Sequence, residues 1–272
     1  MLNGATIGEG NEAVNVTVKV IAADLISGNS SIEISDPATF EAVFTSLNSY
    51  SLANKTITLT ADIDGTGLTV ASKWYFEGSK NVTFDGGGHK ISNLALNGGL
   101  IPSGFFSGLT VKDITFENCT VTQGPLGAGV GMVAAQLYGN FTLENIKVVG
   151  GSVNGFAACG GLVGQFTNED GGKYTATLNG CSVTDCAITA IGHENPAETN
   201  MGIGGANAFI GAAVQWPGLY GTNAEVEVVM NDCATSGCTF DYPDTYAGGG
   251  LYAKTSINVN GQQGETTLVP IP

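Results

Sequence analysis

Four carboxylates recur near the predicted corners of repeated segments, and acids so placed could hydrolyse a glycosidic bond. They are Asp85, Asp113, Glu117 and Glu144. A glycosidase holds two carboxylates across a groove, roughly 5–9.5 Å apart, one as acid and the other as nucleophile or base. If the chain is a hydrolase, Asp85, Asp113 and Glu117 are the candidates. Acids are also ordinary turn residues, so the pattern alone assigns no catalytic residue.

Aromatic side chains in polar segments offer a different chemistry, because a flat ring can stack on a sugar without any charge. Two long predicted loops, about residues 189–206 and 213–225, interrupt the later repeats. Loops on a rigid scaffold often carry function, although loops can also simply cover an edge. The predicted ligand-binding residues are Trp74, Tyr75, Trp216, Tyr220, Tyr242 and Tyr246. The first loop also contains His193, Glu194, Glu198 and Asn200.

We expect no bound cofactor. The turn at residues 62–67, DIDGTG, is similar to a calcium loop but lacks the full ligand set of an EF-hand. Calcium at this turn is the alternative to a plain polar turn. His89 stands beside a glycine corner with no second histidine nearby, which favours a turn residue over a catalytic one. No Cys or His spacing typical of zinc is present.

The chain has six cysteines, several of which recur at equivalent positions of the repeats. Cys119, Cys186 and Cys238 each stand five residues after Ile114, Cys181 and Cys233, respectively. This alternation with apolar residues favours buried free thiols that act as small hydrophobes. Stacked parallel strands are about 4.8 Å apart, so distance alone leaves the disulfides Cys181–Cys233 and Cys186–Cys238 open.

These residues are carried by a repeat of strand, small or polar corner, and strand. It starts at residues 81–94, NVTFDGGGHKISNL, and returns in altered form. One column, spaced by 32, 32, 35 and 52 residues, contains Val82, Ile114, Ile146, Cys181 and Cys233. Small-apolar-small motifs form a second column between them: Phe105, Met132, Leu162, Phe209 and Leu251. Strand-only units of this length predict a parallel β-helix with three short strands in each repeat.

The boundaries follow from where this pattern begins. Residues 1–35 are a lead-in segment with strands at 13–21 and 31–34, which either finish a preceding module or form an edge on the first coil. Residues 36–50 predict a helix with Asp36 as N-cap and Pro37 at its first position. That helix should cover the apolar end of a β-helix formed by residues 36–272. The segment 56–63 should be the first strand.

The composition of the chain limits the classes of partner that the protein can bind. The net charge is −15, and the nine basic residues are all lysines. An acidic surface repels phosphate backbones and anionic headgroups, so we expect no nucleic-acid binding and no direct membrane insertion. No apolar run approaches the roughly 20 residues of a spanning helix. The lack of a signal peptide fits a cytoplasmic chain or a mature secreted form, and the composition favours the second.

Two motifs carry a family resemblance. Residues 160–164, GGLVG, match the GLUG motif, and residues 84–91, FDGGGHKI, resemble the turn that precedes it in such proteins. The match covers about residues 32–190 well and the last coils loosely. The family consists of bacterial surface proteins with a right-handed parallel β-helix similar to that of pectin lyases. The resemblance implies secretion and surface display, and it carries no agreed catalytic residues.

Three functions remain. The favoured one is a non-enzymatic, monomeric, secreted or cell-surface protein, similar to adhesins, that binds glycan or matrix. A polysaccharide lyase or glycosidase is the alternative, although the lack of arginine counts against lyase chemistry. A structural spacer is the third. Ice binding needs stacked Thr-x-Thr rows, and the threonines at 56, 58, 60, 175 and 177 do not recur in register in the sequence.

Overall fold

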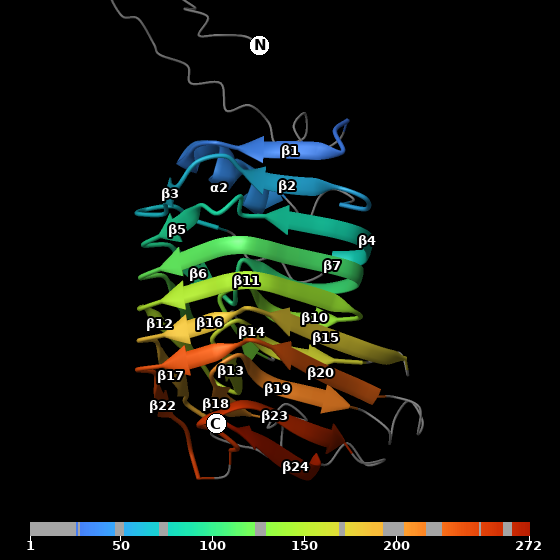
Figure 1. Ribbon diagram of the computed structural model, residues 1–272, viewed down its shortest axis with the longest axis vertical. Helices are drawn as coiled ribbons and strands as arrows, with labels where there is room; N and C mark the ends of the chain where they lie inside the picture. The colour runs from blue at the N-terminus through green and yellow to red at the C-terminus, as the bar shows by residue number, and fades with distance from the viewer. Residues whose placement is uncertain are drawn as a thin grey trace, which may run out of the picture.

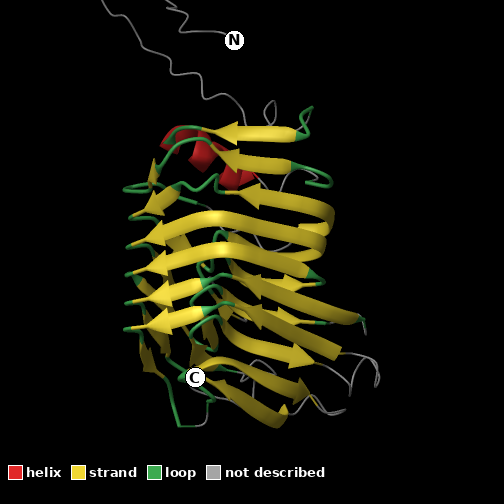
Figure 2. Cartoon of the chain, viewed as in Figure 1, coloured by secondary structure: helices red, strands yellow, loops and turns green. Residues whose placement is uncertain are grey.

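The computed structural model describes residues 26, 28–46, 52–70, 76–122, 129–168, 172–192, 204–215, 225–244, 246–257 and 263–272. In this part of the chain the structure is almost entirely β, with 24 strands and one helix, α2 (Pro37–Ser46). The strands are arranged as successive coils stacked along the long axis (Figures 1 and 2).

Each coil begins where the chain returns to the same side of the stack. The first two coils contain β1 (Ser31–Ile34), β2 (Thr56–Leu59) and β3 (Ile63–Asp64). The next two contain β4 (Phe76–Asp85), β5 (Lys90–Ser92), β6 (Ala95–Asn97), β7 (Ile101–Glu117), β8 (Thr120–Thr122) and β9 (Gly129–Val130). The long strand β7 passes through two corners without losing its pairing.

The later coils repeat this order. One contains β10 (Ala134–Tyr138), β11 (Phe141–Val149), β12 (Ser152–Gly155) and β13 (Ala158–Gly160). The next contains β14 (Val163–Thr167), β15 (Lys173–Asn179), β16 (Ser182–Thr184), β17 (Ala187–Ala190) and β18 (Gly205–Asn207). The last contains β19 (Ile210–Gln215), β20 (Glu225–Asn231), β21 (Ala234–Ser236) and β22 (Thr239–Asp241), followed by β23 (Gly250–Ile257) and β24 (Gln263–Pro270).

Pairing between coils is parallel from β1 to β23. For example, Leu109 of β7 lies in register with Val82 of one coil and Phe141 of the next. Only the final pair, β23 with β24, is antiparallel among the described strands. Alternate residues point inward, so one apolar core runs through the stack. Its largest fully buried side chains include Phe40, Phe116, Phe166 and Phe209.

Left-handed corners divide each coil. The backbone φ is close to +52° at Asp113, Asn145 and Asp232, and Gly180 takes the same place with φ of 60°. Asn and Asp tolerate this conformation best among residues with a side chain, because their short polar groups can bond locally. The side chains also link coils: Asn145 Nδ2 donates to Asp113 Oδ1 at 2.9 Å. The corners therefore set the shape of the coil, and their side chains hydrogen-bond it to the neighbouring coil.

A second set of left-handed corners follows five residues after the first: Asn118, Gly150, Asp185 and Gly237. The backbone N–H groups of Asn118, Gly150 and Asp185 still donate to the next coil, as from Asn118 to Val149 O at 2.9 Å. These breaks cut the complete later coils into more than three short strand segments. The prediction of three strands per repeat was therefore too low, since single-residue corners leave little trace in hydrophobic periodicity.

The predicted columns are correct in the middle of the chain and shifted at its start. Ile114 and Ile146 do lie in register. Val82 does not join them, because it pairs with Leu109, while the longer turn after Asp85 brings His89 O to the amide of Thr115. In the second column, Leu162 Cα lies beside Val133 rather than Met132, and Phe105 pairs with Tyr138. Unequal turn lengths shift the register without changing the repeat pattern.

The helix covers the first end of the core, as predicted. Asp36 caps it, since Oδ1 accepts the Thr39 N–H at 2.9 Å. Phe40 and Val43 are fully buried, and the Phe44 ring meets Phe84 of β4 with centroids 5.2 Å apart. The helix ends at Ser46 among the described residues, and positions 47–50 of the predicted helix lie outside them.

The lead-in strand at residues 31–34 forms an edge on the stack. Ser31, Ile32, Glu33 and Ile34 of β1 pair in register with residues 56–59 of β2. Of the two alternatives given for this strand, the structure therefore shows the edge on the first coil. The predicted strand at 13–21 lies outside the described residues. The predicted strand 56–63 is divided into β2 and β3 by a bend at residues 60–62.

Close packing of glycines explains the GGLVG motif physically. The strands β9, β13 and β18 form a small sheet that lies against β10, β14 and β19. A Cβ placed on Gly164 would stand 2.1 Å from Val130 N and 2.5 Å from Ala135 O. A Cβ on Gly211 would stand 2.4 Å from Cys159 N. The two sheets thus meet backbone to backbone, and only glycine leaves room for that approach.

The cysteines are free thiols, and four of them are buried. Register places Cys181 beside Cys233, and Cys186 beside Cys238, in adjacent coils. Burial raises the pKa of Cys159 and of Cys186 to about 12. The hydrogen bond with Cys181 outweighs burial at Cys233 and lowers its pKa to about 7. The half-exposed Cys233 is therefore the thiol best suited to react, because the thiolate is the nucleophile.

Thiol labelling should separate these classes. In denaturant we expect all six thiols to react with an alkylating reagent. In the native protein at mildly alkaline pH, Cys233 should react first and Cys238 next, since both are half-exposed in the last coil. Mass spectrometry of the labelled peptides measures this. A denatured count near zero, or fast native labelling of Cys159, would contradict the packing described here.

Candidate functional site

A column of threonines runs along the outer surface of the stack. Register pairs Thr56 with Thr83, Thr83 with Thr110, Thr110 with Thr142 and Thr142 with Thr177. All five side chains are half-exposed, while the residues on either side of Thr83, Thr110, Thr142 and Thr177 are buried, as is Ile57 after Thr56. We call this surface of β2, β4, β7, β11 and β15 the threonine face; the strands lie one below another in Figure 1.

A second outward column lies two residues further along each strand. It contains, in register, Thr58, Asp85, Lys112, Glu144, Asn179 and Asn231. Lys112 Nζ lies 2.7 Å from Asp85 Oδ2, and Asn231 Nδ2 donates to Asn179 Oδ1 at 2.8 Å. On the other side stand corner residues such as Asn54 and Asn81, whose side chains bond at 3.0 Å. The face is thus hydroxyl-rich, with amides and charged side chains along one margin and amides along the other.

The threonine column corrects one expectation. The threonines do recur in register, because coils of unequal length still align strand with strand. The residues that flank them outward are nevertheless charged or amide-bearing, as Asp85, Lys112 and Glu144 show. Stacked Thr-x-Thr rows are therefore absent from the described strands of this face. Ice binding is disfavoured by the charged and amide residues beside the threonines, and not by a lack of register among the threonines.

The predicted acids lie close together but are engaged in ion pairs. Asp85 and Asp113 both face Lys112, with Lys112 Nζ 2.7 and 3.7 Å from their nearest oxygens. Burial works to raise the pKa of Asp85, but hydrogen bonds from Lys112 and the Gly87 N–H outweigh it and leave that pKa below its usual value. A general acid needs the opposite shift. Asp85 is thus not tuned for glycoside protonation.

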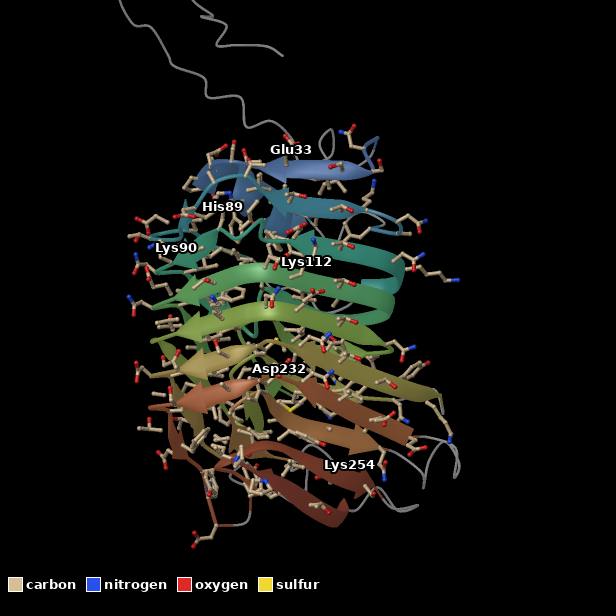
Figure 3. All side chains as sticks on the ribbon, viewed as in Figure 1. Glu33, His89, Lys90, Lys112, Asp232 and Lys254 are labelled. Atoms are coloured by element: carbon tan, nitrogen blue, oxygen red, sulfur yellow. The ribbon has the colours of Figure 1, made fainter. Side chains whose placement is uncertain are left out.

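Glu117 lies beyond the Asp113 corner and has a different partner. Its Oε2 lies 2.9 Å from Lys90 Nζ, and the hydrogen bond with Glu117 raises the pKa of that lysine. The pair joins β5 to β7 on a surface that adjoins the threonine face at the corner, with Lys90 labelled in Figure 3. The structure therefore brings Asp85 and Asp113 to one lysine and gives Glu117 another.

The turn similar to a calcium loop has its carboxylates occupied by protein donors. Asp64 Oδ1 accepts from the backbone and hydroxyl of Thr66, at 3.1 and 2.7 Å, and from Asn93 at 3.2 Å. Asp62 Oδ1 accepts the Lys90 N–H and faces His89 Nδ1, both at 3.1 Å. Within the described ranges, no group of three or more His, Cys, Asp or Glu could hold a metal ion.

The predicted aromatic residues fall into three classes. Trp74, Tyr75, Trp216 and Tyr220 lie outside the described residues. Tyr246 is only 8% exposed and packs over Gly204, where a Cβ would stand 2.4 Å from its ring. This burial removes Tyr246 from the predicted sugar-stacking set. Tyr242 is half-exposed and packs over Gly248, so one predicted platform ring remains at the surface of the described part.

No family model matches the chain. No curated protein matches it either. Among solved structures, the chain is similar to a "putative immunoglobulin A1 protease" from Bacteroides ovatus, with 15% identity, a TM-score of 0.45, and coverage of 84% of this chain and 68% of that one.

The described residues include no helix with the length and apolar character needed to span a bilayer.

Proposed function

We propose that the protein is a non-enzymatic, secreted or cell-surface binding protein, adhesin-like, that holds a glycan or matrix molecule on the threonine face. The finer architecture proposed with it is a right-handed, single-stranded parallel β-helix related to GLUG-motif surface proteins. The in-register threonine column carries the proposal. Its hydroxyls repeat about every 4.8 Å along a rigid sheet, and each can donate and accept a hydrogen bond.

Charge narrows the ligand class. The net charge is −15, and the lysines Lys90, Lys112 and Lys173 are each paired with a carboxylate. Uronic-acid and sulfated polymers would meet repulsion on such a surface. Neutral and amino-sugar glycans suit it better, since hydroxyl and amide groups recognise them by hydrogen bonding. The lowered pKa of Asp85 argues against a role for this residue as a general acid.

Paired valine substitutions test the face directly. The double variant Thr110→Val and Thr142→Val keeps the shape and strand propensity of both side chains but removes two hydroxyls. With each hydrogen bond contributing about 1 kcal/mol, we expect binding on a neutral-glycan and matrix-protein array to weaken by about tenfold or more. Thr120→Val is the matched control, because Thr120 is exposed on β8, on another surface of the same coil.

The same samples should be followed for product release. Binding without new reducing ends or unsaturated sugars is expected. New products lost on Asp85→Asn would make the protein an enzyme instead. Loss of binding on Trp216→Ala, with the double threonine variant unchanged, would move the site to the loop around residue 216. Absence of both binding and product would favour the spacer function.

A further inference from the structure

The last coil has an edge that no described strand covers. β20, β21 and β22 each pair with the preceding coil only, through β15, β16 and β17 respectively. Figure 1 places β20 and β22 near the C-terminal end of the stack. An uncovered edge presents a row of backbone N–H and C=O groups to a further strand. Beside them the chain covers its own edge, since β24 pairs antiparallel with β23.

The interior of the stack is partly open along this edge. Leu178 and Ile188 are fully buried in the preceding coil. Their register partners one coil later, Met230 and Phe240, are half-exposed. Cys181 and Cys233 differ in the same way. The other end of the stack carries α2 instead, and Ile32 and Ile34 of the edge strand β1 are buried there. The two ends of the described stack are therefore unlike, because the last coil leaves apolar residues half-exposed where the first coil buries them.

The outward side of the open edge is acidic. Glu225, Glu227, Asp232 and Asp241 are all exposed there. Two acids of the stack meet a lysine directly opposite in the adjacent coil. Lys173 lies in register with Glu225, with Nζ 2.9 Å from Oε2. Lys112 lies in register with Asp85, and its Nζ is 2.7 Å from Asp85 Oδ2. A strand added beyond β20 with a lysine opposite Glu227 would form the same kind of ion pair.

We propose that this open edge binds an extended segment of another polypeptide, in which lysines alternate with apolar residues, as the next strand of the stack. The apolar side chains would cover Met230, Cys233 and Phe240, and the lysines would face Glu227, Asp232 and Asp241. Backbone pairing gives such strand addition its affinity and alternate side chains give it specificity. A second copy of this chain fits poorly, because the same acidic edge would face itself.

Two synthetic peptides test the proposal, one with lysine alternating with valine and one with glutamate in place of lysine. Fluorescence anisotropy measures their binding, and mass spectrometry measures native alkylation of Cys233 and Cys238. We expect the lysine peptide to bind and to slow labelling of both cysteines, and the glutamate peptide to do neither. Added salt should weaken the binding.

Charge reversal at the edge provides the decisive variant. Glu227→Lys should weaken the lysine peptide by about fivefold or more and improve the glutamate peptide. Glu33→Lys is the matched control: Glu33 is an exposed acid on the edge strand β1, and Figure 3 labels it at the top of the stack, well away from Asp232. Equal binding of both peptides, no protection of the cysteines, or a dimer in sedimentation with Cys233 protected in the absence of peptide would each overturn the proposal.

Discussion

Gly164→Val should greatly lower the free energy of unfolding of the protein. A Cβ at this position would stand 2.1 Å from Val130 N, 2.5 Å from Ala135 O and 2.5 Å from Gly129 C. All three are backbone atoms, which no rotamer change can move. Relief requires the small sheet of β9, β13 and β18 to separate from β10, β14 and β19. We expect a loss of more than about 4 kcal/mol, in the range of severe core substitutions.

Denaturant unfolding followed by circular dichroism measures this loss, with Gly28→Val as control. Gly28 has no atom within 4 Å of an added Cβ, so the same substitution there should change stability by no more than about 0.5 kcal/mol. Equal stability of the Gly164 variant and the control would show that the two sheets are not in backbone contact.

Phe40→Ala should destabilise the first end of the stack by about 3–5 kcal/mol. The Phe40 ring is fully buried and stands with its centroid 4.6 Å from that of Phe44, which in turn contacts Phe84. Its removal leaves a cavity between the helix and the first coils, and α2 loses one of its two buried phenylalanine rings. Because each coil contacts only its neighbours, the effect should fade along the stack.

Hydrogen exchange can locate this effect along the chain. Amides of β1 and β2 should lose protection in the Phe40 variant, while those of β14 and β19 keep it. Phe156→Ala is the matched control, since Phe156 is 40% exposed and its truncation opens no core cavity. Uniform loss of protection in all coils would contradict the description of the helix as a local cover.

Periodicity predicted the stacked all-β coils and the capping helix because both depend on local spacing. Asp36 and Pro37 indicate the start of the helix, and the alternation of apolar and polar residues at 56–59 indicates a strand. Register between coils was harder. Val82 was matched with Ile114 on similar letters, whereas the structure pairs it with Leu109. The longer turn after Asp85 takes up the difference, and nothing in the local pattern gives its length.

The candidate face was missed for the same reason. Thr83 and Thr142 belong to one column, yet the residues between them include corners of different length. A usable signal was present in the Asn, Asp or Gly that recurs five residues apart, as at Asp113 and Asn118. Aligning the repeats on those corners instead of on apolar letters would have found the register of the later coils.

Burial of single aromatic rings could not be read from the sequence. Tyr246 stands in a polar segment, but the structure packs its ring over Gly204, more than one strand away. Only the fold brings that glycine beneath it. Likewise, the half-exposed Met230 is an apolar residue at the same strand position as the buried Leu178 of the preceding coil. Met230 is half-exposed because no described strand follows β20 in the stack, and a local sequence pattern does not show this.

The direction of the hydrogen bonds has a mechanical consequence. The strands run across the molecule and the first and last described strands lie at opposite ends, so tension between these ends would pull neighbouring coils directly apart (Figure 1). Bonds loaded in this way yield one after another, at low force, like a zipper. A molecule of this kind would lengthen in successive steps of one coil under flow or traction and would dissipate work while its remaining coils stay folded.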